Sequence, residues 1–304
     1  MRVLILGASG MLGSAMMQIF RRDVDHEVFG TLRSPSSLRL LPVAMHSQLL
    51  TNIDVLDQDV LVRTLQRVRP DVVINCVGLI KQLGDAKDPL IALPLNTLFP
   101  QKLSRLCGLA GIRLVHISTD CVFSGRDGMY KEEDISDCED LYGKSKYLGE
   151  IHDESSAITL RTSIIGHELN SAVSLVDWFL AQTTSVKGYA KAIFSGLPTV
   201  ELASIIKNQV LVNPHLCGLY HVAAAPINKF DLLQLVASVY EKSIDIKRDE
   251  SVAIDRSLDA TRFLVATGYR APSWPELIRK MYNEQKLRDT DLAVLKPVTM
   301  SPDA

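Results

Sequence analysis

The first thirteen residues constrain this chain most, because an apolar strand runs there directly into a glycine-rich turn. The sequence Met1-Arg-Val-Leu-Ile-Leu-Gly-Ala-Ser-Gly-Met-Leu-Gly13 is followed by a helical pattern. Glycines let the backbone take positive φ and approach a phosphate closely, and the N–H groups of the following helix attract its charge. Three glycines alone would be ordinary turn chemistry, but the strand and helix around them indicate a nucleotide-binding turn. The expected contacts are Gly7, Ser9, Gly10, Met11, Leu12 and Gly13.

Strands and helices alternate after this turn, which is typical of a parallel sheet covered by helices on both faces. The strands are expected at Arg2–Leu6, Glu27–Leu32, Gln48–Ile53, Val72–Cys76, Arg113–Ser118, Ala157–Thr162 and Leu219–Val222. The helices are expected at Leu12–Phe20, Asp57–Val68, Leu95–Ala110, Leu141–Asp153 and Ile205–Val212, with a last one beginning near Pro275. The sequence therefore predicts an α/β fold, a Rossmann-type doubly wound parallel sheet with a smaller C-terminal substrate-binding lobe.

The order of these elements suggests how the chain is divided. Residues 1–166 are expected to form the NAD(P)-binding domain, and elements near 197–224 to rejoin it. Residues 167–196 and 225–304 are expected to form the lobe and a C-terminal tail. The stretch after about Arg288 has little pattern and suggests a mobile tail or an oligomer contact.

Composition narrows the classes of function. The 304 residues are 47% hydrophobic, enough for a large core, and the net charge of −2 gives no reason to expect nucleic acid or a membrane as partner. The apolar start is too short for a signal or spanning segment, so we expect a cytoplasmic protein, with a homodimer as an open option. The five cysteines and seven histidines are scattered, which predicts reduced thiols and no metal site.

Residues that follow the strands are candidates for cofactor contacts, because ligands of such sheets bind at the carboxyl ends of strands. Arg33 stands where an acidic residue would bind the ribose of NAD, so it favours the 2′-phosphate of NADPH, although a solvated loop arginine is the plain alternative. Further expected contacts are Asp54 and Val55 at the adenine, Cys76, Val77 and Gly78 beside the ribose, and Asn96, which could equally be a helix cap. The predicted cofactor is NADPH, with NADH as the alternative.

Candidate catalytic residues lie farther along the chain. Tyr142 and Lys146 are four residues apart on an expected helix and therefore share a face. A nearby ammonium favours the phenolate and would lower the pKa of the tyrosine toward the range useful for acid–base chemistry. Thr119, at the end of its strand, can add a hydroxyl to the same substrate oxygen. A solvated lysine and an ordinary strand-end threonine are the alternatives.

Three motifs together resemble the dTDP-4-dehydrorhamnose reductase branch of the extended short-chain dehydrogenases/reductases. They are Gly-Ala-Ser-Gly-Met-Leu-Gly at 7–13, Ser-Thr-Asp-Cys-Val-Phe-Ser-Gly at 118–125 and Tyr-Gly-Lys-Ser-Lys at 142–146, and the resemblance covers residues 1–280. It implies that Thr119, Tyr142 and Lys146 are the catalytic trio, that Asp120 lies near the sugar, and that Lys146 also holds the nicotinamide ribose.

The chain departs from this family at positions that concern the substrate. Cys121 stands where a tyrosine is usual, Asp140-Leu141 replaces a proline-asparagine pair, and Ile164 replaces an aromatic residue that would stack on the sugar. We therefore expect a related nucleotide-linked 4-keto-6-deoxysugar, such as an N-acetylated one carried on UDP. Cys121 is interpreted as lining the pocket rather than as a nucleophile. Lys187 is expected to pair with the diphosphate of this substrate.

Three functions remain open from the sequence. The favoured one is an NADPH-dependent reductase of a nucleotide sugar, acting in deoxysugar or polysaccharide precursor biosynthesis. The second is an epimerase or dehydratase on the same scaffold, although Asp120-Cys121 is not the Asp-Glu pair expected of a dehydratase. The third is a non-catalytic NADP-binding regulatory subunit, as known for a relative in the methionine adenosyltransferase system. Such a subunit would have no need for Tyr142 and Lys146.

Overall fold

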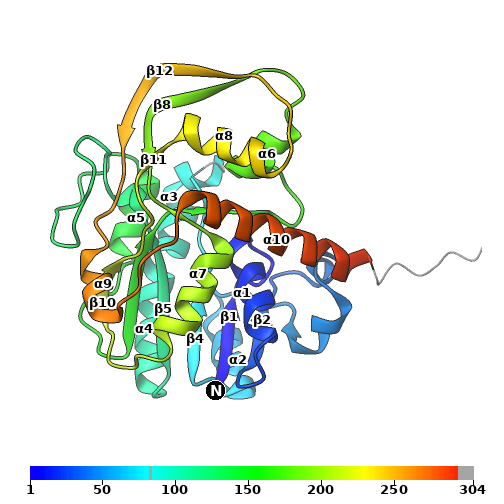
Figure 1. The fold of residues 1–304 in the computed structure, drawn as a ribbon. Coiled ribbons are helices and arrows are strands. Elements are labelled where there is room, and N and C mark those ends of the chain that lie inside the picture. Colours follow the sequence, from blue (N-terminus) through cyan, green and yellow to red (C-terminus); the bar gives the residue numbers. More distant parts are fainter. Residues whose placement is uncertain (82–83, 294–304) are drawn as a thin grey trace, which may run out of the picture.

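The main feature of the fold is a parallel sheet of seven strands. The computed structural model describes residues 1–81 and 84–293. The strands pair in the order β10-β6-β5-β4-β1-β2-β3, and every neighbouring pair is parallel. Their bounds are β1 Arg2–Leu6, β2 Glu27–Thr31, β3 Leu49–Leu50, β4 Val72–Asn75, β5 Arg113–Thr119, β6 Ala157–Thr162 and β10 Gly218–His221. The predicted doubly wound sheet is confirmed, with three strands on one side of β1 and β4 and two on the other (Figure 1).

Helices cover both faces of this sheet because its central strands are apolar on both sides (Figure 1). In β1, Val3 and Ile5 join one core cluster, whereas Leu4 and Leu6 join the other, as the period of two in a strand requires. Helices α1 (Met11–Arg21) and α7 (Thr199–Ile205) supply the first cluster. Helices α2 (Gln58–Val68) and α4 (Phe99–Leu109) supply the second.

Several helices differ from the sequence expectations for identifiable reasons. The helix α5 (Leu141–Leu148) ends before Asp153, and a Cβ at the next residue, Gly149, would lie only 1.9 Å from the carbonyl oxygen of Asn96. The expected helix 95–110 is divided into α3 (Pro89–Leu93), a π-helical turn at Pro94–Leu98 and α4. The helix expected at 205–212 begins earlier, as α7, and closes with a second π-helical turn at Ile206–Val210.

Other ends follow the sequence signals. Asp57 caps α2, because its Oδ1 accepts hydrogen bonds from the backbone N–H groups of Asp59 and Val60, both at 3.0 Å. Arg69 ends that helix in the left-handed region at φ 47°. Four short 3₁₀ helices complete this part, at Pro35–Leu40, Val43–Gln48, Gly84–Lys87 and Asp120–Val122.

A second, smaller sheet lies beyond the carboxyl edge of the large one (Figure 1). Its middle strand β8 (Val186–Phe194) pairs with β12 (Ile246–Asp255) in parallel and with β11 (Ile227–Asn228) in antiparallel orientation. Helix α8 (Lys229–Val239) packs on β8. The remaining elements of this region are α6 Leu175–Ala181, α9 Thr261–Thr267 and the short pair β7 Ile164–Ile165 with β9 Leu197–Pro198.

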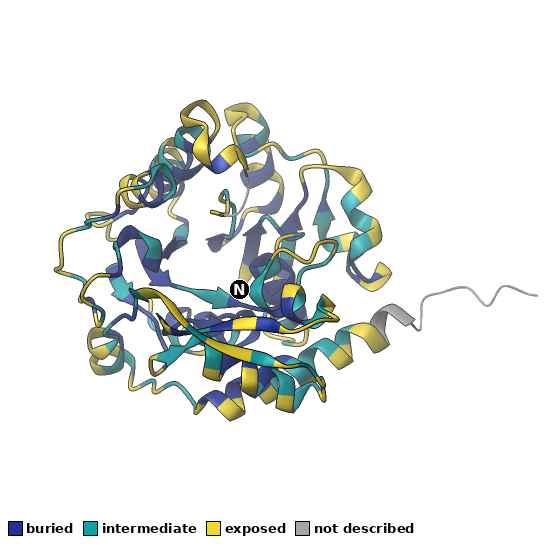
Figure 2. Cartoon of the chain, turned by 90° about the horizontal axis from the view of Figure 1, so that it is seen from above, coloured by how far each residue is buried: buried dark blue, intermediate teal, exposed yellow. Residues whose placement is uncertain are grey.

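Helix α10 (Trp274–Ala293) joins the two regions, because it packs against both α7 and α8. One core cluster accordingly contains residues of α1, α7, α8 and α10. Figure 2 shows the exposed residues mostly at the rim of the molecule and the buried ones mostly inside it. The expectation of little pattern after Arg288 is wrong up to Ala293, where the helix continues; residues 294–304 lie outside the described part. The predicted domain boundaries stay predictions.

Two further observations concern the described residues only. Within residues 1–81 and 84–293, no helix has both the length and the apolar composition needed to span a bilayer. In the same ranges, His, Cys, Asp and Glu side chains do not gather in threes or more in a way that could hold a metal ion.

Candidate active site

The glycine turn after β1 has the close geometry that its sequence predicts. Gly7 lies at φ +82°, and its carbonyl oxygen accepts a hydrogen bond from the backbone N–H of Gly10 at 3.1 Å. A Cβ at Gly13 would lie 2.1 Å from that same oxygen, so a larger residue would force α1 away from the turn. The turn is fixed to β2, because the Gly7 N–H donates to Oγ1 of Thr31 at 3.1 Å. This geometry fits a pyrophosphate at the N-terminus of α1.

Three more predicted cofactor residues lie at the ends of β2 and β3. Arg33 is exposed just beyond β2. Asp54 is also exposed, and its Oδ1 accepts a hydrogen bond from the backbone N–H of Leu56 at 3.0 Å, so its second oxygen is available for a ligand. Val55 packs partly against the core behind it. All three therefore stand at the carboxyl edge where the sequence places them.

The segment after β4 lies directly against the glycine turn. A Cβ at Gly7 would be 3.0 Å from Cγ2 of Val77 and 3.5 Å from the carbonyl carbon of Cys76. A Cβ at Gly78 would be 3.4 Å from Oδ1 of Asn96 and 3.7 Å from Nζ of Lys146. The structure thus brings this predicted cofactor segment next to the predicted catalytic lysine.

Asn96 is not a helix cap, so that alternative is wrong. It is fully buried inside the π-helical turn, where Oδ1 accepts from the Leu79 N–H at 2.9 Å and Nδ2 donates to Ser145 Oγ at 3.1 Å. Asn96 therefore ties the loop after β4 to α5, the helix of Tyr142 and Lys146. π-Helical turns inside α-helices occur frequently at functional sites.

Thr119, Asp120 and Tyr142 come together where β5 ends and α5 begins. Thr119 is the last residue of β5, and its hydroxyl donates to Oδ1 of Asp120 at 3.2 Å. Asp140 caps α5, because its carboxylate accepts from the Gly143 N–H at 2.8 Å and so fixes the helix start next to Tyr142. A hydrogen bond between Thr119 and the Tyr142 hydroxyl counteracts part of the burial that raises the pKa of that tyrosine.

The electrostatics of the pair on α5 correct one expectation. Burial is the largest influence on Tyr142 and Cys121 the next, and together they raise the tyrosine pKa above its usual value. The Lys146 ammonium instead donates a hydrogen bond to the carbonyl oxygen of Ile117 at 2.8 Å. The expectation that Lys146 lowers the tyrosine pKa is wrong for this geometry. Burial lowers the pKa of Lys146 itself to about 8.

Cys121 has the electrostatics of an unreactive thiol, although it is not among the residues that line the cavity described below. Burial raises the pKa of its thiol to about 12, and the neighbouring Asp120 carboxylate acts in the same direction. A thiol with so high a pKa carries almost no thiolate at neutral pH and is a poor nucleophile. Burial likewise raises the pKa of Asp120, while Arg256 opposes that shift more than any other group.

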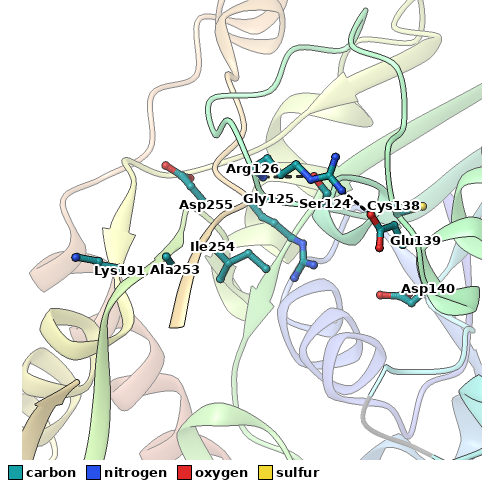
Figure 3. Close-up of a pocket in the computed structure, with 11 residues that line it drawn as sticks. Ser124, Gly125, Arg126, Cys138, Glu139, Asp140, Lys191, Ala253, Ile254 and Asp255 are labelled. Atoms are coloured by element: carbon teal, nitrogen blue, oxygen red, sulfur yellow. Dashed lines mark hydrogen bonds and ion pairs between the residues drawn. The ribbon is translucent and has the colours of Figure 1, made fainter. Parts of the chain in front are cut away.

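A cavity of about 710 Å³ opens between the loops that follow β5 and the smaller sheet, and Thr119, Tyr142 and Lys146 are not among the residues that line it. Figure 3 shows loop residues on one side of it, among them the ion pair of Arg126 with Glu139, and Lys191 on the other. Its lining is formed by Ser124, Gly125, Arg126, Cys138, Glu139, Asp140, Lys191, Ala253, Ile254, Asp255 and Arg256. A cavity of this size matches the usual volume of small-molecule sites.

Two predicted substrate residues fall in different places. Ile164 is half-buried in β7, next to Ser163, whose hydroxyl hydrogen-bonds Asp120. Lys187 lies apart from the cavity lining and is 67% exposed, in an ion pair with Asp249 at 2.8 Å. Lys191, four residues farther along the same face of β8, does line the cavity.

Two cations of the smaller lobe were missed by the sequence analysis. Arg256 lines the cavity, donates from Nε to the carbonyl oxygen of Phe123 at 2.8 Å, and acts on both Asp120 and Asp140. Lys229, at the start of α8, has a pKa lowered by burial, which Asp120 opposes. Both are more than 100 residues away from Asp120 in the sequence, so no local pattern indicates the contact.

Comparison with known proteins shows the family to which the chain belongs. The family model of the RmlD substrate binding domain matches residues 1–285. A probable low-salt glycan biosynthesis reductase, Agl14 of Haloferax volcanii, is 32% identical over 169 residues, which are 54% of this chain and 54% of that protein, so the match spans about half of its length. The beta subunit of methionine adenosyltransferase 2 from Xenopus tropicalis is 24% identical over 313 residues, covering 93% of this chain and 90% of that one.

Solved structures agree in fold. The dTDP-4-dehydrorhamnose reductase of Bacillus anthracis, solved in complex with NADP, superposes with a TM-score of 0.76 at 23% identity, covering 93% of this chain and 99% of the other. A hypothetical dTDP-4-dehydrorhamnose reductase of Sulfolobus tokodaii superposes with a TM-score of 0.73 at 26% identity, covering 90% and 98%. With the family model matching almost the entire chain, this protein belongs to the RmlD substrate binding domain family.

Proposed function

We propose that this protein is an NADPH-dependent reductase of a nucleotide-linked 4-keto-6-deoxysugar. One observation carries the proposal: the glycine turn, the segment after β4, and the side chains of Thr119, Tyr142 and Lys146 all meet at one edge of the sheet. A binding module needs the turn alone. The hydroxyl pair and the buried lysine beside it are what carbonyl reduction requires.

The roles of the side chains follow from their positions. When bound at the glycine turn, the nicotinamide cofactor supplies the hydride that goes to the carbonyl carbon. Tyr142 donates a proton to the carbonyl oxygen, and its raised pKa keeps the hydroxyl protonated at neutral pH. When the substrate is bound, Thr119 turns its hydroxyl proton from Asp120 Oδ1 to the carbonyl oxygen and so donates the second hydrogen bond. Lys146, beside Gly78, holds the ribose of the cofactor.

The proposal includes the cofactor and substrate subsites. Arg33 binds the 2′-phosphate and so selects NADPH over NADH. The sugar lies against Asp120, Cys121 and Ile164, and the nucleotide diphosphate extends into the cavity. Arg256 binds the diphosphate there; in support, it is a cation that lines the cavity and acts on Asp120.

NADPH oxidation tests the proposal directly. The purified chain is mixed with NADPH and a panel of dTDP- and UDP-linked 4-keto-6-deoxysugars, and absorbance at the nicotinamide band is followed. Turnover with at least one of them is expected, and Arg256→Met should raise KM for that sugar far more than it changes the Kd for NADPH. A chain that binds NADPH but reduces no member of the panel contradicts the proposal.

A regulatory subunit is the second candidate, because the methionine adenosyltransferase beta subunit aligns over 93% of this chain. The two functions differ in what Tyr142→Phe does. A reductase loses turnover through this change, whereas a regulatory subunit keeps NADP binding and its effect on a partner enzyme.

A further inference from the structure

Behind the candidate active site lies a carboxylate that the proposed reaction does not use. Glu150 follows the end of α5 by two residues, and its side chain is 0% exposed. Its Oε1 accepts from Ser118 Oγ at 2.5 Å and from Arg161 Nε at 2.8 Å, and its Oε2 accepts from Arg161 Nη2 at 2.7 Å. Such a bidentate, fully buried pair costs desolvation energy that a simple packing role would not require.

The pair contacts the strand that carries Thr119. Ser118 immediately precedes Thr119 in β5, and Ile117 precedes Ser118. The Lys146 ammonium is bound to the Ile117 carbonyl at 2.8 Å. The ammonium of Lys146 and the carboxylate of Glu150 therefore reach two consecutive residues of β5 from the same helical segment.

We propose that Glu150 is a positioning residue of this site, whose carboxylate holds the buried Lys146 in its charged form and fixes the end of β5 that carries Thr119. An ammonium in an apolar interior loses its hydration and tends to lose its proton. A fixed negative charge nearby opposes that loss. Lys146 can then serve the cofactor ribose as a cation at neutral pH.

Two other titratable groups near Lys146 are neutral and therefore supply no negative charge to it. Cys76 lies on the β4 side, where burial raises its thiol pKa to about 12, so it is neutral. His116, on β5, has a pKa far below its usual value because of burial and the nearby Lys146, so it is neutral as well. Glu150 opposes the lowering of the Lys146 pKa more than any other group.

The groups around Glu150 keep it ionised. Arg161, on β6, is its main partner, and His152 approaches its Oε2 at 3.4 Å. Hydrogen bonds from these two side chains and from Ser118 hold the pKa of Glu150 at about 2 despite burial. The carboxylate is therefore charged over the whole pH range in which Lys146 titrates.

The test measures the protonation of Lys146 without any substrate. The difference in unfolding free energy between wild type and Lys146→Met is followed by urea denaturation from pH 6 to pH 10.5. It should begin to change where folded Lys146 begins to lose its proton, near pH 8. The same pair of proteins is then made in a background without the Glu150 charge.

Two variants remove the Glu150 charge, so that the protonation of Lys146 can be measured even if one of them does not fold. Glu150→Gln alone leaves Arg161 buried without its partner, so the double variant Glu150→Gln/Arg161→Met is used beside it. We expect the onset to move down by about one pH unit in Glu150→Gln, as loss of one nearby negative charge implies, and by less in the double variant, which also loses the Arg161 cation. Glu132→Gln is the matched control: the Glu132 side chain is 4% exposed and accepts from the His221 N–H, but does not act on Lys146. An onset that stays near pH 8 without Glu150, or moves equally in the control, overturns the proposal.

The catalytic consequence rests on the proposed reductase function and is measured separately. The rate of NADPH oxidation should decline as Lys146 deprotonates, and this decline should shift to lower pH without Glu150. If no 4-keto sugar is reduced by the wild type, the reductase function fails. The stability measurement still decides the role of Glu150.

Discussion

Removing the charge of Lys146 should stabilise the protein, although the loss of this residue should damage its function. The residue is 6% exposed, and its pKa falls from the usual 10.5 to about 8 because burial disfavours the ammonium. At neutral pH the folded protein therefore holds a charge that the unfolded chain accommodates better. Lys146→Met keeps the length of the side chain and removes that charge.

The magnitude follows from the two pKa values. Their difference is 10.5 − 8 = 2.5, or about 3 kcal/mol at about 1.4 kcal/mol per pKa unit. The lost hydrogen bond to Ile117 offsets about 1 kcal/mol, which leaves a gain of about 2 kcal/mol. For a chain of this size that corresponds to roughly 4 °C in Tm.

The sign of the pH dependence is fixed by the direction of the shift. A lysine with a lowered folded pKa binds fewer protons in the folded state between about pH 8 and 10.5, so wild-type stability rises with pH through this window relative to Lys146→Met. The advantage of the variant should therefore be present at pH 7 and shrink toward pH 10.5. Urea denaturation at both pH values measures it.

A matched variant separates this effect from a general one. Lys144→Met changes an exposed lysine of the same helix and should alter stability by less than about 0.5 kcal/mol at either pH. A Lys146→Met variant that is less stable than the wild type at pH 7, or whose gain in unfolding free energy does not depend on pH, refutes this reasoning. Either result would mean that burying the ammonium does not destabilise the folded protein. NADPH affinity of Lys146→Met should fall in the same samples.

Three further outcomes are expected. Gly13→Ala would place a Cβ 2.1 Å from the Gly7 oxygen and should abolish measurable NADPH binding while lowering stability by about 1–3 kcal/mol, checked by fluorescence titration and urea denaturation. Arg33→Ala should weaken NADPH binding by about one to two decades and leave NADH binding unchanged; equal affinities of the wild type for both cofactors refute the 2′-phosphate contact. The stability contributed by the ionised Glu150 is present above about pH 4.5 and should be lost as pH falls toward about 2, a decline that Glu150→Gln/Arg161→Met should lack in acid denaturation.

The sequence predicts this fold well wherever the signal is local. Apolar runs such as the one ending at Leu6 define the strands, glycine spacing defines the turn, and Asp57 marks a helix start that the structure confirms. The sequence predicts that the helix of Tyr142 continues to Asp153, but α5 ends at Leu148. The next residue, Gly149, packs closely against the backbone of Asn96, which is more than 50 residues away in the chain. Packing between distant segments leaves no periodic pattern to detect.

For the candidate site, too, the sequence predicts the residues that have a local signal and misses those that depend on tertiary contacts. Thr119, Tyr142 and Lys146 follow from spacing and resemblance, and they meet in the structure. The role of Lys187 at the diphosphate stays a prediction: this lysine lies apart from the cavity lining, whereas Lys191 of the same strand belongs to it. Arg256 and Glu150 depend on tertiary contacts with Phe123 and Arg161, which the sequence alone does not indicate.

Single-turnover reduction by Tyr142→Phe tests the central claim most directly. The change removes the hydroxyl and keeps the ring, so the fold and the Kd for NADPH should be retained. Hydride transfer from bound NADPH to the 4-keto sugar should slow by about 10² to 10⁴-fold, the usual contribution of a positioned acid. Reduction at near the wild-type rate would mean that the proton comes from another group and that Tyr142 is not the acid of this site.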